Sequence, residues 1–325
     1  MANRPKKLAL IGAGDIAKFH IPALRASGLE IIHCASRFNS KTVEQFASTH
    51  NIKNVWRNPI DLAASHDQWD GVVISTPTSA TLKLLEKVME SGKPVLVEKP
   101  VATSSTALEA YAKSSPTNVI VAYNRRHYSS VQLAQNFVSS RKMVRATMTL
   151  PENVFPKTNN PFYLIHENSV HGLDMLNYIF GPMQLEHLSN ANSNNQFFGR
   201  HALLRSKTGH LISLSMNWNA PGNFTLSIDD AIERLDLIPF EKFQRYKGMN
   251  VIEPNNEYPI RRYAPNLLHS GSVFDTTPPE IKPGFFGQAY EFSRLFEGNP
   301  AKVSANLTDA YNAQLLAEQL MGSVF

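Results

Sequence analysis

A glycine-rich turn near the start of the chain constrains the fold more than any other part of the sequence. Residues 12–17 read Gly-Ala-Gly-Asp-Ile-Ala, directly after the apolar run 8–11 and directly before a helical pattern. In a GxGxxA turn of this kind Gly12 permits the tight bend and Gly14 lets a pyrophosphate approach the backbone, while the small Ala17 packs helix on strand. The turn therefore predicts the first crossover of a dinucleotide-binding domain.

The helical pattern over residues 16–26 strengthens this interpretation. Main-chain amides at a helix N-terminus bind phosphate oxygens, so Asp15 and Ile16 join Gly12 and Gly14 as predicted cofactor-binding residues. A tight turn without a ligand has the same letters, and methyltransferases use similar glycine turns. The position between a strand and a helix therefore carries the prediction.

Short apolar runs alternate with helical patterns from residue 8 to about residue 123. The expected strands are residues 8–11, 29–35, 71–75, 94–98 and 119–123. The expected helices between them are residues 16–26, 40–49, 80–91 and 105–113. This alternation is typical of parallel strands joined by crossover helices, and it predicts a doubly wound Rossmann sheet.

The pattern changes after residue 123. Helices are expected over residues 129–139, 163–180 and 307–321, and strands over residues 144–150, 202–205, 211–218, 224–228 and 232–237. Few helices separate these strands, which favours an open, mainly antiparallel sheet in an α+β domain. We therefore expect an α/β dinucleotide-binding domain over residues 1–124 and a second domain for substrate binding and oligomerisation over residues 125–325.

Composition excludes several classes of protein. The 325 residues are 42% hydrophobic and 18% charged, with a formal net charge of +5 and no run of Lys or Arg. We therefore expect neither a nucleic-acid-binding tail nor a membrane-surface helix. The single cysteine, Cys34, excludes an internal disulfide framework and a cysteine-rich zinc site. With no apolar stretch of membrane-spanning length and a short, polar N-terminus, the sequence favours a cytoplasmic protein.

The end of the second expected strand bears on the choice of dinucleotide. A carboxylate there usually accepts the hydroxyls of the adenine ribose, but this chain has Ser36 and Arg37. An arginine can bind the additional phosphate of NADP, whereas a carboxylate would repel it. We therefore expect NADP as the cofactor, with NAD as the other possibility; an exposed arginine without a ligand is the alternative interpretation of Arg37.

Several further elements follow the glycine turn in order. They are His20, Thr76-Pro77, Gly92-Lys93-Pro94, Glu98-Lys99-Pro100, Asn124-Arg125-Arg126 and His171-Gly172-Leu173-Asp174. In this order the chain resembles the glucose-fructose oxidoreductase and inositol dehydrogenase family, often called Gfo/Idh/MocA. The resemblance covers most of the first 181 residues, and Glu98-Lys99-Pro100 is its most specific part.

The resemblance implies a Rossmann domain followed by an open antiparallel sheet that covers the nicotinamide and the substrate. It implies that Lys99 lies in the active site near the transferred hydride, where a lysine can polarise a substrate oxygen. The other implied cofactor-binding residues are Thr76, Pro77 and Glu98, and the implied substrate-binding residues are Asn124, Arg126 and Asp174. Taken without its neighbours, Lys99 would be interpreted as a surface lysine in a turn.

A helical stripe supplies the expected proton carrier. Glu167, His171 and Asp174 fall at i, i+4 and i+7 of the expected helix 163–180 and so share one face. In the family the first of these is usually aspartate, and with the histidine it handles the proton of the substrate hydroxyl. His166 and His171 are five residues apart and diverge around the helix axis, so we expect no metal site.

Two positions depart from the family pattern. Ser169 stands where a glycine is expected, and Thr81 stands near the place where the family often has a histidine. These departures bear on which substrate the site accepts and, to a smaller degree, on whether the site is catalytic. A histidine bonded to a neighbouring acid is the structural alternative for His171.

The leading hypothesis is an NADP-linked or NAD-linked dehydrogenase or reductase of a sugar, cyclitol or nucleotide-linked sugar. The second is a catalytically inactive dinucleotide-binding regulator of the same family, against which the retention of Lys99 and His171 argues. A methyltransferase is the third, although it gives Glu98-Lys99-Pro100 no role. By analogy with the family we expect a homo-oligomer, and we expect it to act on a small-molecule, sugar-like substrate. Arg125, Arg126, Arg261 and Arg262 are candidate contacts to a charged substrate, and ordinary surface or interdomain pairing is the alternative interpretation of these arginines.

Overall fold

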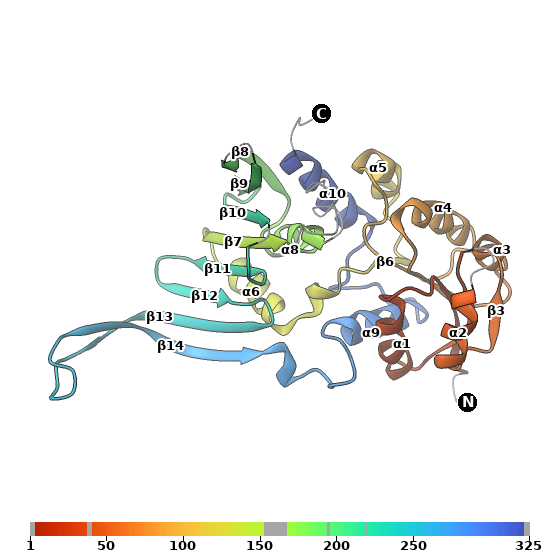
Figure 1. Ribbon diagram of the computed structural model, residues 1–325, viewed down its shortest axis with the longest axis horizontal. Coiled ribbons are helices and arrows are strands. Elements are labelled where there is room, and N and C mark those ends of the chain that lie inside the picture. Colours follow the sequence, from red (N-terminus) through yellow and green to blue (C-terminus); the bar gives the residue numbers. More distant parts are fainter. Residues whose placement is uncertain (1–3, 38–40, 153–167, 194–195, 219, 322–325) are drawn as a thin grey trace. The chain divides into compact units, whose positions relative to one another are not determined.

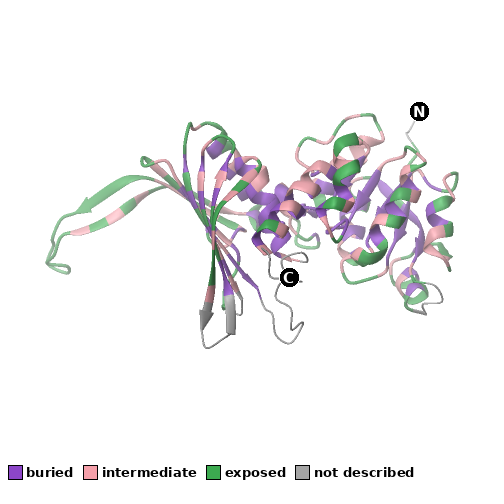
Figure 2. Ribbon diagram, turned by 90° about the horizontal axis from the view of Figure 1, so that it is seen from above, coloured by how far each residue is buried: buried purple, intermediate pink, exposed green. Residues whose placement is uncertain are grey.

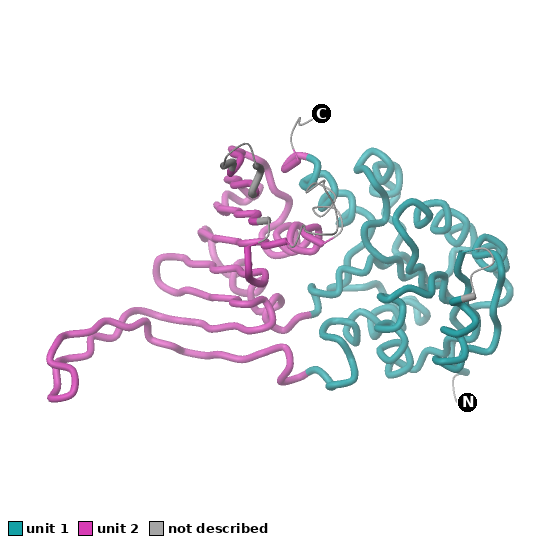
Figure 3. Tube along the Cα trace, viewed as in Figure 1, with its two compact units in different colours: residues 1–127, 277–318 teal, residues 128–276, 319–325 magenta. Residues whose placement is uncertain are grey.

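The computed structural model describes residues 4–37, 41–152, 168–193, 196–218 and 220–321. The chain divides into two compact units (Figure 3). Unit 1 comprises residues 1–127 and 277–318, and unit 2 comprises residues 128–276 and 319–325. Each unit has its own sheet and is described separately below.

In the described part of unit 1, six parallel strands form one sheet in the order β3-β2-β1-β4-β5-β6 (Figure 1). The strands are β1 Lys6–Ile11, β2 Leu29–Ala35, β3 Asn54–Trp56, β4 Gly71–Ile74, β5 Val95–Val97 and β6 Val119–Val121. The chain proceeds outward from β1 in one direction and from β4 in the other. Strand order therefore reverses between β1 and β4, at the edge where open sheets bind ligands. The predicted doubly wound parallel sheet is confirmed.

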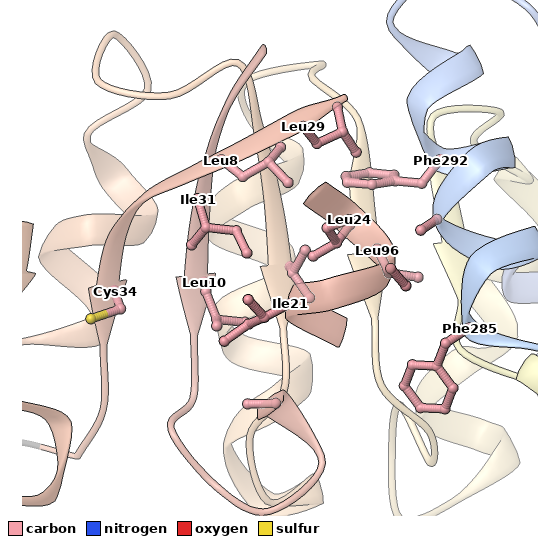
Figure 4. Packing of buried hydrophobic residues seen from close by; sticks show 14 of the residues in the cluster. Leu8, Leu10, Ile21, Leu24, Leu29, Ile31, Cys34, Leu96, Phe285 and Phe292 are labelled. Carbon is pink, nitrogen blue, oxygen red and sulfur yellow. The ribbon is translucent and has the colours of Figure 1, made fainter. Parts of the chain in front are cut away.

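Helices connect these strands and pack against the sheet to form the core. They are α1 Ala17–Ala26, α2 Lys41–Thr49, α3 Pro59–Ala64, α4 Thr78–Met89 and α5 Ser105–Ser114. In Figure 4, Ile21 and Leu24 of α1 lie against Leu10 and Leu96 of the sheet. Burying one side chain of this size completely contributes about 1.5–3 kcal/mol to the free energy of unfolding.

Unit 1 also contains a segment from the far end of the sequence. Helix α9, Phe285–Leu295, packs along α1 and places Phe285 and Phe292 in the same core (Figure 4). Helix α10, Leu307–Met321, is joined to α5 because the Ser105 N–H donates to Glu318 Oε1 at 2.6 Å.

The expected domain boundary between residues 124 and 125 differs from this division. The first segment of unit 1 ends at residue 127, and residues 277–318 return to unit 1 instead of belonging to the second domain. The return is held by side-chain contacts such as His127 Nε2 to Ser304 Oγ at 2.9 Å. Pairings across such a sequence separation leave no local pattern from which they can be predicted.

The described part of unit 2 has an eight-stranded sheet in the order β14-β13-β12-β11-β7-β10-β9-β8. The strands are β7 Arg145–Glu152, β8 Met183–Ser193, β9 Gln196–Ser206, β10 Leu211–Trp218, β11 Thr225–Asp229, β12 Glu233–Leu237, β13 Lys242–Ile252 and β14 Arg262–Ser272. Only β7 and β10 pair in parallel among these strands, so the predicted, mainly antiparallel sheet is confirmed. Helices α6, Ser129–Ser139, and α8, Val170–Phe180, pack together in this unit.

Two strands of unit 2 continue as a ribbon beyond the rest of the sheet. Side chains of β13 and β14 are mostly exposed along this ribbon, in contrast to the buried residues of the neighbouring strands (Figure 2). Arg262 lies there, with its guanidinium 4.1 Å from the centroid of the Tyr258 ring, and Arg261 donates to Glu253 at 3.1 Å. Arg261 is exposed, whereas Arg262 is half-buried.

Candidate functional site

The glycine turn is fixed by the sheet on its inner side and open on its outer side. Gly12 has φ +114°, and its N–H donates to the Ala35 carbonyl at 2.8 Å. A Cβ on Gly12 would lie 1.9 Å from the Ser75 carbonyl oxygen, whereas a Cβ on Gly14 would meet no atom within 4 Å. Only glycine fits at the first position, and the exposed second position leaves the backbone accessible to a ligand.

The start of α1 has the features expected of an anion-binding helix N-terminus. Helix α1 begins directly after Ile16, whose side chain makes no capping hydrogen bond to the first amides. Asp15 is exposed and its carboxylate accepts from Lys18 Nζ at 3.0 Å. Ala17 is fully buried, so the small residue packs the helix close to the sheet as predicted. Main-chain N–H groups in this position suit a pyrophosphate.

Ser36 and Arg37 follow β2 at the same edge of the sheet. Ser36 is half-buried and Arg37 is exposed. Ala35 pairs with Trp56 of the neighbouring strand β3, so Arg57 follows its strand at the same level as Ser36. Arg57 is exposed and is a second cation that the sequence analysis missed. Recognising β3, which has only three residues, would have revealed it.

The end of β4 contributes a buried hydroxyl. Ser75 is 6% exposed, and within the described residues its Oγ has no hydrogen-bond partner. Buried hydroxyls are normally satisfied, so an unsatisfied one beside the glycine turn fits a site that a polar ligand completes. Thr76 and Pro77 follow at this edge, and the Thr76 hydroxyl lies 3.0 Å from that of the buried Thr81.

Glu98 and Lys99 follow β5 at the same carboxyl edge. Glu98 is buried, and its Oε1 lies 2.7 Å from Nε2 of the buried His20. Its second oxygen, Oε2, accepts from the Lys99 N–H at 3.2 Å. Lys99 is half-buried and precedes Pro100 through a cis peptide bond. The structure thus brings together the predicted Glu98-Lys99-Pro100 element and His20.

The returning segment places a second lysine near Glu98. The Lys282 ammonium lies 4.7 Å from the Phe19 ring centroid and 5.5 Å from that of Phe285. Partial burial, together with the charge of Arg125, lowers the pKa of Lys282, and the Glu98 carboxylate opposes this effect. Lys282 was not predicted as a site residue because nothing local in the sequence indicates that residue 282 lies near residue 98.

Asn124 and Arg126, the predicted substrate-binding residues of unit 1, also contact the returning segment. The Asn124 side chain donates to the Pro283 carbonyl at 3.0 Å, and Arg126 Nη1 lies 3.2 Å from Asp309 Oδ2. Both residues are buried. In this structure these contacts tie the N-terminal and C-terminal parts of unit 1 together.

In unit 2, helix α8 carries the other predicted residues. His171 is 9% exposed and Asp174 is fully buried. A Cβ on Gly172 would lie 2.5 Å from the Leu150 side chain, which shows how closely the helix approaches β7. Glu167, the predicted partner of His171, and His166 lie outside the described residues.

A buried carboxylate at the end of β7 explains one departure from the family pattern. Glu152 Oε1 accepts from the Ser169 hydroxyl at 2.7 Å, and Oε2 accepts from Asn168 Nδ2 at 2.9 Å. Glu152 and Ser169 are both buried. A glycine at position 169 would leave this carboxylate with one partner fewer, so Ser169 and Glu152 belong together. Glu152 was not predicted from the sequence as a site residue.

Neither a metal-binding cluster nor a membrane-spanning helix occurs among the described residues. No cluster of three or more His, Cys, Asp or Glu side chains with a geometry suited to a metal ion occurs in that part of the chain. No helix there combines the length and the apolar character needed to cross a membrane.

Comparisons with known proteins agree with the fold. Residues 6–124 match the family model GFO_IDH_MocA, described as an oxidoreductase family with an NAD-binding Rossmann fold. YrbE of Bacillus subtilis, an uncharacterized oxidoreductase, is 27% identical over 184 residues, which are 53% of this chain and 53% of YrbE. The chain thus matches about half the length of that relative.

A longer match and a solved structure extend the likeness. Inositol 2-dehydrogenase of Rhodococcus jostii is 25% identical over 312 residues, which are 92% of this chain and 82% of the relative. The structure of levoglucosan dehydrogenase in complex with NADH and levoglucosan superposes with a TM-score of 0.76 at 17% identity, covering 98% of this chain and 97% of that one. The fold of the whole chain is therefore that of these oxidoreductases.

Proposed function

Because residues 6–124 belong to the Gfo/Idh/MocA oxidoreductase family with an NAD-binding Rossmann fold, we propose that this chain is a nicotinamide-dependent oxidoreductase. It transfers a hydride between the dinucleotide and a hydroxyl or carbonyl group of a sugar, cyclitol or nucleotide-linked sugar. The observation that carries the proposal is the common edge of the unit 1 sheet. There the open glycine turn at Gly14, the unsatisfied Ser75 hydroxyl and Lys99 all follow the carboxyl ends of parallel strands.

The residues at this edge suit a dinucleotide. Main-chain amides around Gly14 and at the start of α1 hold the pyrophosphate. The Ser75 hydroxyl is available as a further hydrogen-bonding group. When bound, the nicotinamide ring supplies or accepts the hydride.

NADP is the preferred dinucleotide in this proposal. Arg37 and Arg57 are both exposed at the end of two paired strands, and a phosphate on the adenine ribose would meet two cations there. Ser36 adds a neutral hydrogen-bonding group in place of the usual acid. Paired arginines favour a phosphate through charge and through planar donor geometry.

Lys99 and His171 carry the chemistry of the substrate. The Lys99 ammonium polarises the substrate oxygen, which favours hydride transfer to or from the attached carbon. His171 moves the proton of the hydroxyl group, because an imidazole changes protonation state near neutral pH. Glu167 orients the imidazole or binds the substrate, and Asp174, on the same helix face, is a further substrate-binding group.

The substrate class is supported by relatives of two kinds. The Rhodococcus jostii relative is an inositol dehydrogenase, and the similar solved structure holds levoglucosan, an anhydrosugar. A polyhydroxylated ring is the feature that these compounds share. We therefore place cyclitols and sugars first among candidate substrates.

We also propose that the chain forms a homo-oligomer. Support comes from the ribbon of β13 and β14, which exposes large apolar side chains to solvent. These are Met249, Val251, Ile252, Tyr258, Ile260, Tyr263, Leu267 and Leu268. Apolar groups gathered on an isolated ribbon indicate an interaction surface. Light scattering on the purified chain measures the assembly, and a monomer at all concentrations contradicts this part of the proposal.

The experiment that tests the proposed function is hydride transfer itself. The purified chain is mixed with NADPH and a panel of ketoses, inososes and nucleotide-linked keto sugars, and with NADP and the matching alcohols, while nicotinamide absorbance is followed. We expect turnover with at least one polyhydroxylated substrate. Tight NADPH binding with no turnover over the panel would instead indicate a dinucleotide-binding regulator.

A further inference from the structure

A buried histidine and a buried glutamate bind each other directly beside Lys99. His20 is 2% exposed on α1, and Glu98 is 6% exposed just after β5. His20 Nε2 and Glu98 Oε1 are 2.7 Å apart, although the residues are separated by 78 positions in the sequence. The contact joins the helix that follows the glycine turn to the segment directly after β5, which contains Lys99.

Hydrogen bonds fix both the main chain and the side chain of Glu98. Its main-chain N–H donates to the Ile74 carbonyl at 2.8 Å, which continues the pairing of β5 with β4. Its Oε2 accepts from the Lys99 N–H at 3.2 Å. The carboxylate therefore bridges the His20 ring and the Lys99 backbone.

The His20 ring is itself supported from the returning segment. Its centroid lies 4.9 Å from that of Phe285, with the two planes inclined by 56°. Phe285 is 2% exposed and belongs to the core drawn in Figure 4. Because the ring packs on one side and hydrogen-bonds at its edge, the imidazole has little freedom to turn away from Glu98.

We propose that His20 is a positioning residue for hydride transfer, acting through Glu98 to fix the backbone from which the Lys99 ammonium extends. This inference rests on the proposed function, in which Lys99 contacts the substrate. Loss of the donor at position 20 leaves a buried carboxylate without its closest partner, and such a group moves or draws in water. The Lys99 backbone then loses its fixed acceptor, and an error of about 1 Å at a reacting group costs about 100-fold in rate.

Three variants separate positioning from general stability. His20→Phe keeps a ring against Phe285 but removes the donor to Glu98. His20→Gln places an amide donor at the same position and is the conservative rescue. His33→Phe is the matched control, because His33 is 5% exposed on β2 of the same sheet and lies 3.1 Å from the Gln68 carbonyl, away from Lys99.

Kinetics and cofactor binding are measured for all three folded variants with the best substrate of the panel. We expect His20→Phe to lower kcat by about 10- to 100-fold with less than about a threefold change in the Kd of NADPH. His20→Gln should recover most of that loss, and His33→Phe should keep the kcat of the unmodified protein. An unchanged kcat in His20→Phe, or an equal loss in His33→Phe, overturns the proposal.

A second measurement does not depend on turnover. Competitive acetylation with limiting acetic anhydride, read by mass spectrometry, compares the labelling rate of Lys99 with that of Lys93 in each protein. A half-buried Lys99 released from its fixed backbone should label at least about threefold faster in His20→Phe, but not in His20→Gln or His33→Phe. Equal Lys99 labelling in all proteins overturns the positioning role. Absence of hydride transfer in the unmodified protein would contradict the proposed function alone, because the labelling result is read separately.

Discussion

Gly12 lies so close to Ser75 that a Cβ on the glycine would be 1.9 Å from the Ser75 carbonyl oxygen. The contact joins the ends of β1 and β4, the two strands between which the order of the sheet reverses. Gly14, two residues later, has open space where its side chain would be. The two glycines of one turn therefore have different surroundings: Gly12 is held against the sheet, whereas Gly14 has the open space that the proposed dinucleotide needs.

This difference predicts opposite behaviour of two alanine variants. Gly12→Ala combines a main-chain clash with φ +114°, so we expect a loss of about 2–4 kcal/mol in the free energy of unfolding. Gly14→Ala should leave stability within about 0.5 kcal/mol but weaken NADPH binding at least about tenfold, because the new methyl group occupies the space that a phosphate approaches. Urea unfolding without cofactor and a fluorescence titration with NADPH test both. Unchanged NADPH affinity in Gly14→Ala contradicts the assignment of this turn.

The arginines that follow β2 and β3 predict a cofactor preference. NADPH should bind more tightly than NADH, and Arg37→Asp should erase or reverse the preference because it replaces a cation by an anion beside the ribose phosphate. Arg57→Ala should weaken NADPH more than NADH. Nucleotide fluorescence titrations give all of these dissociation constants, and equal affinities for the two cofactors in the unmodified protein would contradict the prediction.

Most of unit 1 was predictable from sequence because its central strands β1, β4 and β5 are largely buried. The runs at β1, β4 and β5 consist of apolar residues bounded by turns, and the glycine turn fixes where the first crossover begins. Strand β3 was missed because it has three residues, of which Asn54 and Val55 are exposed. Because β3 was not predicted, the position of Arg57 at the end of that strand was not predicted either.

The remaining part of the site depends on distant contacts. Phe285 and Lys282 reach the edge of the unit 1 sheet only because the chain returns after residue 276. The pairing of Ser169 with Glu152 likewise joins the start of a helix to the end of a strand. Neither this pairing nor the return of the chain can be predicted from local sequence patterns. Residue types and strand ends were therefore predictable, whereas the partners of buried polar groups were not.

The helix stripe in unit 2 makes a kinetic prediction. His171→Ala should lower kcat about 100-fold or more, which is the usual scale for losing general acid–base help. Alcohol oxidation by the unmodified protein should slow as pH falls through one ionisation, because a protonated imidazole accepts no further proton. Glu167→Asp, the commoner family residue, should be tolerated better than Glu167→Gln. Near-normal kcat with an unchanged pH profile in His171→Ala would return His171 to a structural role.

His127 predicts how stability depends on pH. Burial, with a further contribution from the Arg126 charge, lowers the pKa of His127 to about 4, and the Glu291 carboxylate opposes this effect. The unfolded chain therefore takes up a proton at this group first as the pH falls. The stability that neutral His127 contributes is present above its unfolded pKa of about 6.5 and is lost between there and about pH 4.

The test compares the unmodified protein with His127→Gln by urea unfolding at about pH 7.5 and about pH 5. Between these values the unmodified protein should lose about 2 kcal/mol more than the variant. Burial raises the pKa of Glu291, but hydrogen bonds from Ser304 and its neighbours outweigh that effect and lower it, so this carboxylate stays ionised over the window. An equal loss in both proteins would mean that His127 is accessible to protons in the folded state.

Lys99 is the residue on which the proposed chemistry depends, and Lys99→Met tests it most directly. Single-turnover hydride transfer from bound NADPH is followed by nicotinamide absorbance, with the Kd of NADPH measured on the same samples. In the proposed function the ammonium polarises the substrate oxygen, while the glycine turn and Arg37 hold the dinucleotide independently. We therefore predict a rate lowered at least about 1,000-fold with NADPH affinity unchanged within about threefold. Hydride transfer in Lys99→Met near the rate of the unmodified protein would contradict the account.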